Sequence, residues 1–431
     1  MALSAWKSEN VASQSMIFLQ RLLHGYQPRN FAIELWDGTR WEPEPGQFHR
    51  FVWRVNRPGA LREAFEEASQ LTLAEAFIYG DFDLDGDIEA VFPLTDYLTS
   101  HLWNKKEKLQ LGSMLYALPK DGQARPRRPG LRLHGRSHSK DRDRQAVRYH
   151  YDVSNDFYGL WLGEAMAYSC AYFKTPEDNI DTAQSQKFDY ICRKLRLQPD
   201  ERLLDIGCGW GGLILYAAKH YGVRAVGITL SEQQFGLATR RIRNAGLEDR
   251  CEIRLQDYRE VGDDGKYDKI ASVGMVEHVG EHNLPEYFGR AYRLLRPGGV
   301  FLNHGIGVPE SRAESKGPSF VDLYVFPDGE LLPIATTTRA AEHAGFEVRD
   351  IENLREHYAL TCSQWVRGLE EHAEQARRLV DEVTYRIWRL HTAGSAYYFR
   401  RGWLELYQTL LVKNEEGRSG LPLTRADWYR G

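Results

Sequence analysis

A glycine-rich stretch that could bind a cofactor lies near the middle of the chain, LLDIGCGWGG at residues 203–212. Gly207, Gly209 and Gly212 form the pattern G-x-G-x-x-G, which holds a dinucleotide pyrophosphate where it joins a strand to a helix. Glycine lets the backbone approach a ligand closely, and the start of a helix offers free N–H groups. Because this stretch lies between a predicted strand and a predicted helix, a nucleotide-like ligand is favoured over a purely structural loop.

Asp205 indicates which nucleotide this is. It lies two residues before Gly207, at the end of the predicted strand, where its carboxylate would repel a pyrophosphate. S-adenosylmethionine instead carries a cationic amino group and a sulfonium, so electrostatics favours this cofactor over NAD. The structural alternative is that Asp205 caps the helix that follows.

Polar residues after the next two predicted strands could complete an adenosine site. Thr229 and Gln234 lie in GITLSEQQ, at the place where a dinucleotide site would carry an acidic residue for the ribose. After the third strand, Asp257 could accept a hydrogen bond from the adenine amino group, and Tyr258 could stack on the adenine ring.

Further motifs follow one another between residue 149 and about residue 370: HYDVSNDFYGLWL, YSCAYF, LLDIGCGWGG, GITLSEQQ, SVGMVEHVG, LLRPGG and HYALTCSQW. In identity and order they resemble the cyclopropane fatty acid synthase family, which includes the mycolic acid cyclopropane synthases. The N-terminal LTLAEAFIYGDFDLDGDIEAVFPL also resembles the lipid-handling domain of the phospholipid-acting members. The resemblance implies transfer of a one-carbon unit from S-adenosylmethionine to the cis double bond of an unsaturated acyl chain.

The resemblance also implies the site residues. In the family a bound bicarbonate removes the proton from the cationic intermediate, and the residues at the positions that hold it are Cys170, Glu277, His304 and Tyr358. Structural alternatives are a buried thiol, a helix cap, a core histidine and a core aromatic ring, respectively. The expected cofactor-binding residues are Tyr168, Ser169, Asp205, Gly207, Gly209, Gly211, Gly212, Thr229, Gln234, Asp257 and Tyr258. No metal site is expected.

Aromatic rings near the reacting atoms could stabilise the sulfonium and the developing carbocation through their faces. The candidates are Tyr168, which resembles a cofactor contact of the family, and Tyr172, Phe173 and Tyr398, for which core packing is the alternative. Many family members carry a second cysteine in the C-terminal helices, where this chain has Ser395. We therefore do not expect Ser395 to be catalytic.

The elements that must position these residues alternate between strand and helix. The candidate strands are RLLDIG, RAVGITL, CEIRLQ, YDKIASVG and VFLNHGIG, and helical stretches such as GGLILYAAKHYG lie between them. Such alternation predicts a parallel sheet that binds ligands at the carboxyl ends of its strands. We expect an α/β fold for residues 149–431, a Rossmann-like doubly wound methyltransferase sheet with a helical lid.

Two different regions precede this catalytic domain. In residues 1–118, FAIELWDGTRW alternates around an Asp-Gly turn, as hairpins do, and helix-like stretches follow, which predicts a small α+β lipid-interaction domain. Residues 119–148 form an expected basic linker, with ten Lys or Arg against three Asp between Lys120 and Arg148.

Composition excludes several functions. A net charge of −4 does not fit a globally basic nucleic-acid binder, and five cysteines without a C-x-x-C pair indicate neither a disulfide framework nor a zinc site. We find no secretion signal and no membrane span. The expected protein is cytoplasmic, associates peripherally with the inner face of the membrane and acts on an unsaturated phospholipid there. The basic linker or the apolar residues of MIFLQRLL, residues 16–23, could provide the contact. A homodimer is left open.

Two other functions are also left open. Plant alkaloid N-methyltransferases resemble the catalytic half, although a small amine substrate needs no lipid domain. A non-catalytic lipid-binding protein is the other alternative, against which the intact glycine loop and the complete set of four catalytic residues count. The product is open as well, because cyclopropane-forming and methylene-forming members share these motifs.

Overall fold

The computed structural model describes residues 2–120, 133–151, 153–262, 265–312 and 319–429. The chain divides into two compact units. The smaller unit contains the N-terminal region together with two later segments, α12 (Phe320–Tyr324) and the part of α16 (Glu382–Arg400) that ends at Gly394. The larger unit contains most of the rest of the chain and all of the expected site residues.

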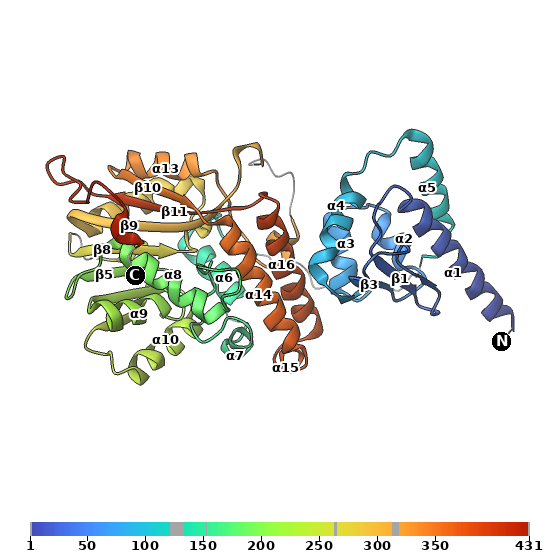
Figure 1. Ribbon diagram of the computed structural model, residues 1–431, viewed down its shortest axis with the longest axis horizontal. Helices are drawn as coiled ribbons and strands as arrows, with labels where there is room; N and C mark the ends of the chain where they lie inside the picture. Colours follow the sequence, from blue (N-terminus) through green and yellow to red (C-terminus); the bar gives the residue numbers. More distant parts are fainter. Residues whose placement is uncertain (1, 121–132, 152, 263–264, 313–318, 430–431) are drawn as a thin grey trace. The chain divides into compact units, whose positions relative to one another are not determined.

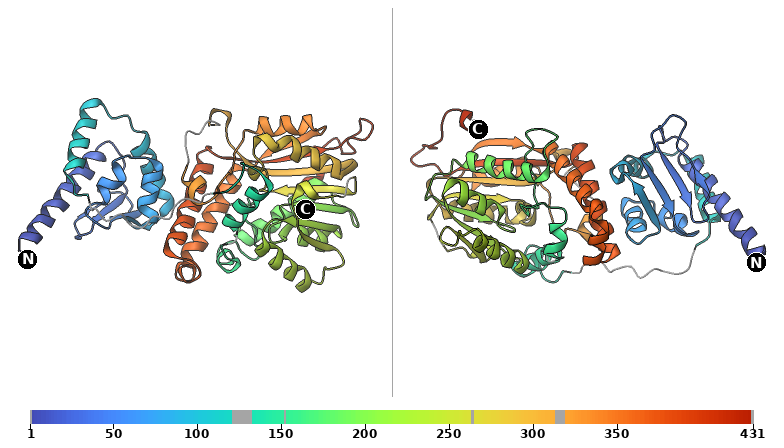
Figure 2. Two further views of the ribbon diagram at one scale, coloured as in Figure 1. Left: turned by 180° about the vertical axis from the view of Figure 1, so that it is seen from behind. Right: turned by 60° about the horizontal axis from the view of Figure 1, so that its bottom comes forward.

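A four-stranded sheet in the order β2-β1-β3-β4 forms the centre of the smaller unit (Figure 2). The expected hairpin is present, since β1 and β2 pair antiparallel across the Asp37-Gly38 turn. β3 runs parallel to β1, and β4 runs antiparallel to β3. The strands and helices of this α+β unit are β1 (Phe31–Leu35), β2 (Arg40–Trp41), β3 (Phe51–Val55), β4 (Phe82–Gly86), α1 (Ala2–Leu22), α2 (Ala60–Phe65), α3 (Gln70–Ile78), α4 (Phe92–Ser100) and α5 (Lys105–Ala117).

The two later segments are fixed to the smaller unit by polar contacts. Tyr324 of α12 donates a hydrogen bond to Glu75 of α3 over 2.8 Å. Arg386 of α16 donates to the carbonyl oxygen of Phe77 over 3.0 Å and forms an ion pair with Asp83 of β4 over 2.7 Å. Contiguous boundaries drawn from the sequence do not include these segments, which follow the N-terminal region by more than 200 residues.

The stretch MIFLQRLL belongs to the core of the smaller unit. Met16, Phe18, Leu19, Leu22 and Leu23 are all buried, because they pack inward from α1 and its C-terminal end. Ile17 is the exposed apolar side chain of the stretch. The expectation that these residues form an amphipathic membrane anchor is therefore wrong.

A seven-stranded sheet forms the centre of the larger unit, in the order β10-β11-β9-β8-β5-β6-β7 (Figure 1). Neighbours from β7 across to β9 pair parallel, whereas β11 pairs antiparallel with both β9 and β10. All five predicted strands are present, and the α/β methyltransferase fold is confirmed. The strands are β5 (Arg202–Ile206), β6 (Arg224–Thr229), β7 (Cys251–Leu255), β8 (Tyr267–Val273), β9 (Leu295–Gly307), β10 (Glu347–Asn353) and β11 (Glu405–Val412).

Helices cover both faces of this sheet (Figure 1). Leu203 of β5 belongs to the apolar layer against α8 and α9, and the next residue, Leu204, belongs to the layer against α11 and α13. This alternation buries both faces, as parallel sheets require. The main helices are α7 (Asn155–Gly159), α8 (Ile180–Leu195), α9 (Gly212–Tyr221), α10 (Glu232–Asn244), α11 (Leu284–Leu294), α13 (Ile334–His343), α14 (Arg355–Glu371) and α15 (Ala373–Leu379).

The strand order reverses at β5, which lies between β6 and β8. In doubly wound sheets the ligand crevice opens at such a switch point, outside the carboxyl ends of the strands. The glycine loop follows β5 directly, so the fold places it at the edge of this crevice.

The C-terminal part of the expected linker is a helix of the larger unit, α6 (Lys140–Tyr151). Its charges form ion pairs there: Arg142 bonds to Asp328, and Asp143 lies 2.9 Å from Arg259. Arg142 and Asp143 therefore hold α6 to the larger unit through ion pairs, and this part of the stretch is not a solvated linker. The linker residues Arg125, Arg127, Arg128 and Arg132 lie outside the described residues. No helix in the described part of the chain is long and apolar enough to span a bilayer.

Candidate active site

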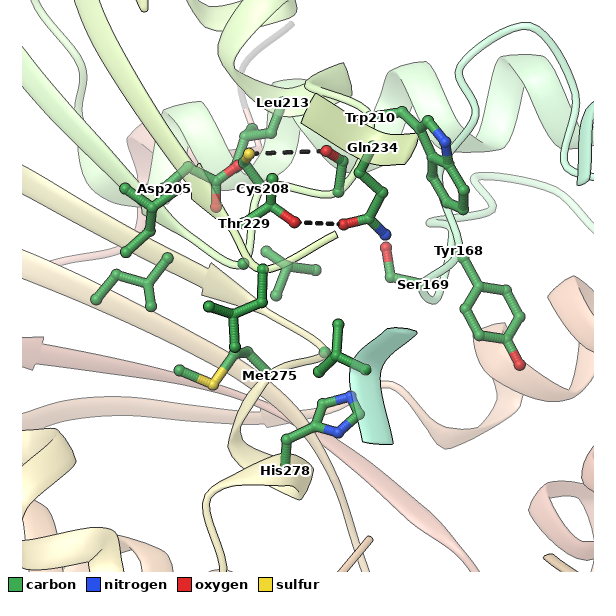
Figure 3. A pocket seen from close by; sticks show the side chains of 18 of the residues that line it. Tyr168, Ser169, Asp205, Cys208, Trp210, Leu213, Thr229, Gln234, Met275 and His278 are labelled. Carbon is green, nitrogen blue, oxygen red and sulfur yellow. Dashed lines mark hydrogen bonds between the residues drawn. The ribbon is translucent and has the colours of Figure 1, made fainter. Parts of the chain in front are cut away.

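A cavity with about 1100 Å³ of empty space, partly open to solvent, lies at the carboxyl ends of β5, β6 and β8. The side chains drawn in Figure 3 surround it, with Asp205, Thr229 and Gln234 on one side and Met275 and His278 on the other. All the expected cofactor residues except Gly211 line this cavity. Gly211 instead precedes α9 as its N-cap, with φ +80°, and a Cβ there would lie 3.3 Å from Ala238.

The glycines of the loop have two different roles. A Cβ added at Gly209 would meet no protein atom within 4 Å, and its φ of +54° is in the left-handed region, so this residue presents bare backbone to the cavity. A Cβ at Gly212 would lie 2.7 Å from the ring of Phe188. Gly212 therefore allows α9 to pack closely on α8, and Gly209 allows a ligand to approach the loop.

Thr229 fixes the orientation of the Gln234 amide. The Thr229 hydroxyl donates to Gln234 Oε1 over 2.6 Å, which leaves the amide nitrogen directed into the cavity (Figure 3). Ser231 caps α10 by accepting from the backbone N–H of Gln234, so the helix start is fixed as well. The cavity thus has an oriented amide donor, the Gln234 side chain, beyond the carboxyl end of β6.

Asp205 is a buried carboxylate at the end of β5 and is 2 % exposed. Its Oδ1 has no hydrogen-bond partner among the described residues. Burial raises the pKa of Asp205 to about 7, and the positive charge of Lys187 acts in the opposite direction. The N-cap of α9 is Gly211, without a side-chain cap bond, so Asp205 does not cap that helix. Its carboxylate is available to a cationic group in the cavity.

Arg259 orients the acidic residue that follows β7. It donates to both carboxylate oxygens of Asp257, over 2.8 and 2.6 Å, and also bonds to Asp143 of α6 over 2.9 Å. Asp143, Asp257, Tyr258 and Arg259 all line the cavity. Sequence reasoning missed Arg259 and Asp143, although Arg259 directly follows the predicted pair Asp257-Tyr258.

The four expected catalytic residues are all buried, and His304 pairs with Val273 at the carboxyl end of β8. Glu277 Oε1 accepts from the backbone N–H of Ile306 over 2.7 Å, which holds it beside the strand that carries His304. After burial, the charges of Cys362, Tyr168, Cys170 and Glu277 contribute to the raised pKa of Tyr358. Cys170 and Glu277 therefore lie within electrostatic range of Tyr358, and Glu277 is held beside the strand of His304.

Two polar atoms of this group have no partner in the part of the chain that the structure describes. They are Glu277 Oε2 and His304 Nε2. The other ring nitrogen of His304, Nδ1, lies 3.1 Å from Gln408 Nε2 on β11. In this orientation of the Gln408 amide its nitrogen donates, so Nδ1 accepts and Nε2 carries the ring hydrogen. The group thus offers one unused donor and one unused carboxyl oxygen.

Burial sets the protonation of these residues. It raises the pKa of Glu277 to about 7 and lowers the pKa of His304 well below its usual value, with Lys187 lowering it further. It also raises the pKa of Cys170, whose Sγ donates to the carbonyl oxygen of Ala171. Burial therefore favours a neutral imidazole at His304 and a thiol rather than a thiolate at Cys170.

One tryptophan connects this group with the cofactor cavity. Tyr168, which lines the cavity, stacks on Trp365 of α14 at 5.1 Å between ring centroids, and Tyr358 meets the same ring edge-on at 5.9 Å. Sequence reasoning missed Trp365, although it is the last residue of the motif HYALTCSQW. Tyr172 stacks on His357 and Tyr398 on Trp403; with Phe173, they are not among the described residues that line the cavity.

A family model described as mycolic acid cyclopropane synthetase matches residues 138–409. The chain belongs to this family. A probable fatty acid methyltransferase of Pseudomonas putida is 41% identical over 402 residues, which cover 92% of this chain and 96% of that protein. The cyclopropane-fatty-acyl-phospholipid synthase of Escherichia coli is 33% identical over 380 residues, covering 86% and 90%.

A solved structure of the mycolic acid cyclopropane synthase CmaA1, complexed with SAH and CTAB, shares the fold of the catalytic part. Its TM-score is 0.59 at 32% identity, with coverage of 62% of this chain and 97% of that chain. These findings confirm the expected family, and the chain is an S-adenosylmethionine-dependent methyltransferase of the cyclopropane synthase type.

Proposed function

We propose that the enzyme transfers a one-carbon unit from S-adenosylmethionine to the cis double bond of an unsaturated phospholipid acyl chain. The observation that carries this proposal is the buried polar group of Glu277 and His304, with its two unused atoms, on segments that adjoin the cavity-lining residues Val273 and Met275. A methyltransferase that acts on an amine needs no such group, because the amine nitrogen already carries the reacting electron pair. An alkene acceptor forms a cation that must lose a proton to a base.

The residues of the cavity fit S-adenosylmethionine, which supplies an electrophilic methyl group when bound. Asp205 would hold its ammonium group, and Asp257 and Tyr258 would hold the adenine. The oriented amide of Gln234 would donate to an oxygen of the cofactor. Tyr168 places an aromatic face in the cavity wall, where it would stabilise the sulfonium.

The second group fits a small oxyanion. His304 Nε2–H would donate to it, Glu277 Oε2 would share a hydrogen with it, and the Tyr358 hydroxyl and the Cys170 segment would enclose it. Bicarbonate bound there would supply the base for the reaction. Because all four residues are buried, they keep bulk water from a carbocation that water would otherwise capture.

The product depends on whether a hydride shift precedes loss of the proton. Without the shift, loss of a proton from the added methyl group lets the C–H electron pair close a cyclopropane ring. A hydride shift first moves the cation onto the carbon that bears the methyl group, and loss of a proton from that methyl group then leaves a methylene branch. Both outcomes are compatible with the site, and the relatives include both a cyclopropane synthase and a fatty acid methyltransferase by name.

Mass spectrometry of lipids from a host that expresses the protein tests the function. We expect unsaturated phospholipid acyl chains to gain the mass of one CH₂ group, and mild hydrogenation to separate a methylene branch from a ring. Unchanged lipids, together with methylation of a soluble amine by the purified enzyme, would contradict the proposal.

The enzyme must also reach its substrate, and we propose that it does so at an anionic membrane surface. On and just before α5 of the smaller unit, Leu102, Leu109 and Tyr116 are 92, 76 and 60% exposed and follow one another at seven-residue intervals. The helix also carries the exposed residues Lys105, Lys106 and Lys108. Exposed apolar side chains among lysines fit a surface that inserts at the lipid boundary and attracts anionic headgroups.

A further inference from the structure

Lys187 is a fully buried lysine in the wall of the cofactor cavity, and burial lowers its pKa to about 7. Its side chain extends from α8, is 1% exposed, and donates from Nζ to the hydroxyl of Ser169 over 2.9 Å. No carboxylate of the described residues forms an ion pair with it. Burying an ammonium group costs several kcal/mol unless an anion compensates for the lost hydration. The Ser169 hydroxyl and the ring of Phe188, whose centroid lies 4.3 Å from Nζ, carry no net charge and do not supply that compensation, and an ammonium has three hydrogens to donate.

A second lysine on the same helix shows the contrast. Lys194 lies two turns further along α8 and is equally buried, at 1% exposure. It forms ion pairs with Glu352 and Asp350 of β10, so its charge is neutralised inside the protein. On the same helix, therefore, Lys194 has carboxylate partners within the protein, whereas Lys187 lines the cavity.

Asp205 has the complementary property on the same cavity. Its carboxylate interacts electrostatically with Lys187, yet the two residues form no direct ion pair, and Asp205 Oδ1 has no partner among the described residues. One end of the cavity thus presents a positive and a negative group side by side, each with hydrogen-bonding capacity left. A ligand that complements both must carry an anion and a cation close together.

The methionine group of S-adenosylmethionine has this character, because its carboxylate and its ammonium group are bonded to the same carbon. We infer that Lys187 binds the carboxylate of the cofactor while Asp205 binds its ammonium group. The inference rests on the proposed use of this cavity for S-adenosylmethionine, and it names the residue that would recognise the cofactor's acid group.

The segment that carries Tyr168 and Ser169 does not depend on Lys187 alone. Gln184, one turn earlier on α8 and fully buried, donates to the carbonyl oxygens of Ala167 and Ser169 over 3.1 and 2.9 Å. The backbone N–H of Ala171 donates to Thr361 over 3.0 Å. Removing the ammonium of Lys187 should therefore leave the segment in place, which makes its binding role testable.

The test is calorimetric titration of the full chain with S-adenosylhomocysteine and with its decarboxylated analogue, which keeps the amino group. If Lys187 forms a charge-assisted hydrogen bond with the carboxylate, Lys187→Met should weaken the binding of S-adenosylhomocysteine by about 10- to 100-fold. The decarboxylated analogue should bind the parent and the variant equally. Lys187→Gln, which keeps a donor for Ser169 without the charge, should behave like the methionine variant.

Lys194→Met is the matched control, because it removes an equally buried ammonium outside the cavity. It should lower the melting temperature and leave the affinity for S-adenosylhomocysteine unchanged. The inference would be overturned if Lys187→Met weakened the binding of both ligands equally, or the binding of neither. It would also be overturned if the only effect of the variant were an altered dependence of turnover on bicarbonate. Failure of the parent to bind S-adenosylhomocysteine would contradict the proposed function itself.

Discussion

Glu277 is a single residue whose burial has measurable consequences for stability. Its pKa in the folded protein is about 7, above the ordinary 4.5, so the folded state holds the proton more tightly than the unfolded state does. The associated stability is complete below pH 4.5 and is lost as the pH rises through about 7. Glu277→Gln keeps an oxygen for the N–H of Ile306 and removes the ionisable group.

We therefore expect Glu277→Gln to be about as stable as the parent near pH 4.5 and more stable at pH 8, by up to about 3 kcal/mol. Urea unfolding of both proteins at the two pH values measures this difference. Comparison with the parent cancels the titration of other groups. A difference that does not change with pH would show that the carboxyl is not the titrating group.

The same residue and its neighbour should separate cofactor binding from chemistry. Glu277→Gln and His304→Ala should lose turnover by about 100-fold or more, the range expected for loss of proton-transfer catalysis. Their affinity for S-adenosylhomocysteine should stay within twofold of the parent's, or about 0.4 kcal/mol. Turnover of the parent should fall in decarbonated buffer and return when bicarbonate is added. Variants that turn over normally would show that the two unused atoms have no role in catalysis.

At the scale of elements, the loop between β5 and α9 allows the backbone strain of a substitution to be separated from its effect on cofactor binding. Gly209 and Gly246 both have positive φ, +54° and +64°, and a Cβ at either would meet no protein atom within 4 Å. Alanine at each position should therefore cost a similar amount of stability, about 1–2 kcal/mol. Only Gly209→Ala should also weaken the binding of S-adenosylhomocysteine, by about tenfold or more, because its methyl group would occupy the cavity. Similar affinities in the two variants would show that the loop does not contact the cofactor.

The elements differ in how far the sequence reveals them. The five parallel strands were predictable because β5, β6 and β8 are short, largely apolar runs that alternate with helices, and the glycine loop marks the first of them. β10 was not predicted, because EVRDIEN at the sheet edge is mostly partly exposed and charged. The association of α12 and α16 with the smaller unit depends on contacts between residues more than 200 positions apart, which no local pattern records.

The site shows the same limit. Asp205 and Gly209, which line the cavity, could be predicted because the spacing of the glycine motif is local. Lys187 was missed, since a lysine in an amphipathic helix is usually solvated, and its burial results from the segment around Ser169 packing on α8. Gln408 was missed for a similar reason, because β11 joins the sheet beside His304 from 104 residues later in the chain.

At the scale of the whole molecule, the proposed function requires that the enzyme reach an acyl chain in a bilayer. Two surfaces suggested by the sequence are now weaker candidates. The apolar residues of MIFLQRLL are in the core of the smaller unit, and part of the basic stretch forms α6 with internal ion pairs. The exposed surface on α5, made of Leu102, Leu109 and Tyr116 with the three neighbouring lysines, is the docking surface that the described residues support best.

Co-sedimentation of the full chain with vesicles containing phosphatidylglycerol tests this surface. Since each lysine near an anionic surface contributes about 1 kcal/mol, replacing Lys105, Lys106 and Lys108 by Glu should weaken binding by about 100-fold or more, and Leu109→Asp should weaken it further. High salt should weaken binding of the parent. The matched control reverses three exposed charges of the larger unit, Lys219, Arg240 and Arg243, and should bind almost normally. A further variant in the same experiment reverses the charges of Arg125, Arg127, Arg128 and Arg132. If that change abolishes binding while the α5 variants still bind, the basic stretch is the docking element and the α5 surface is not.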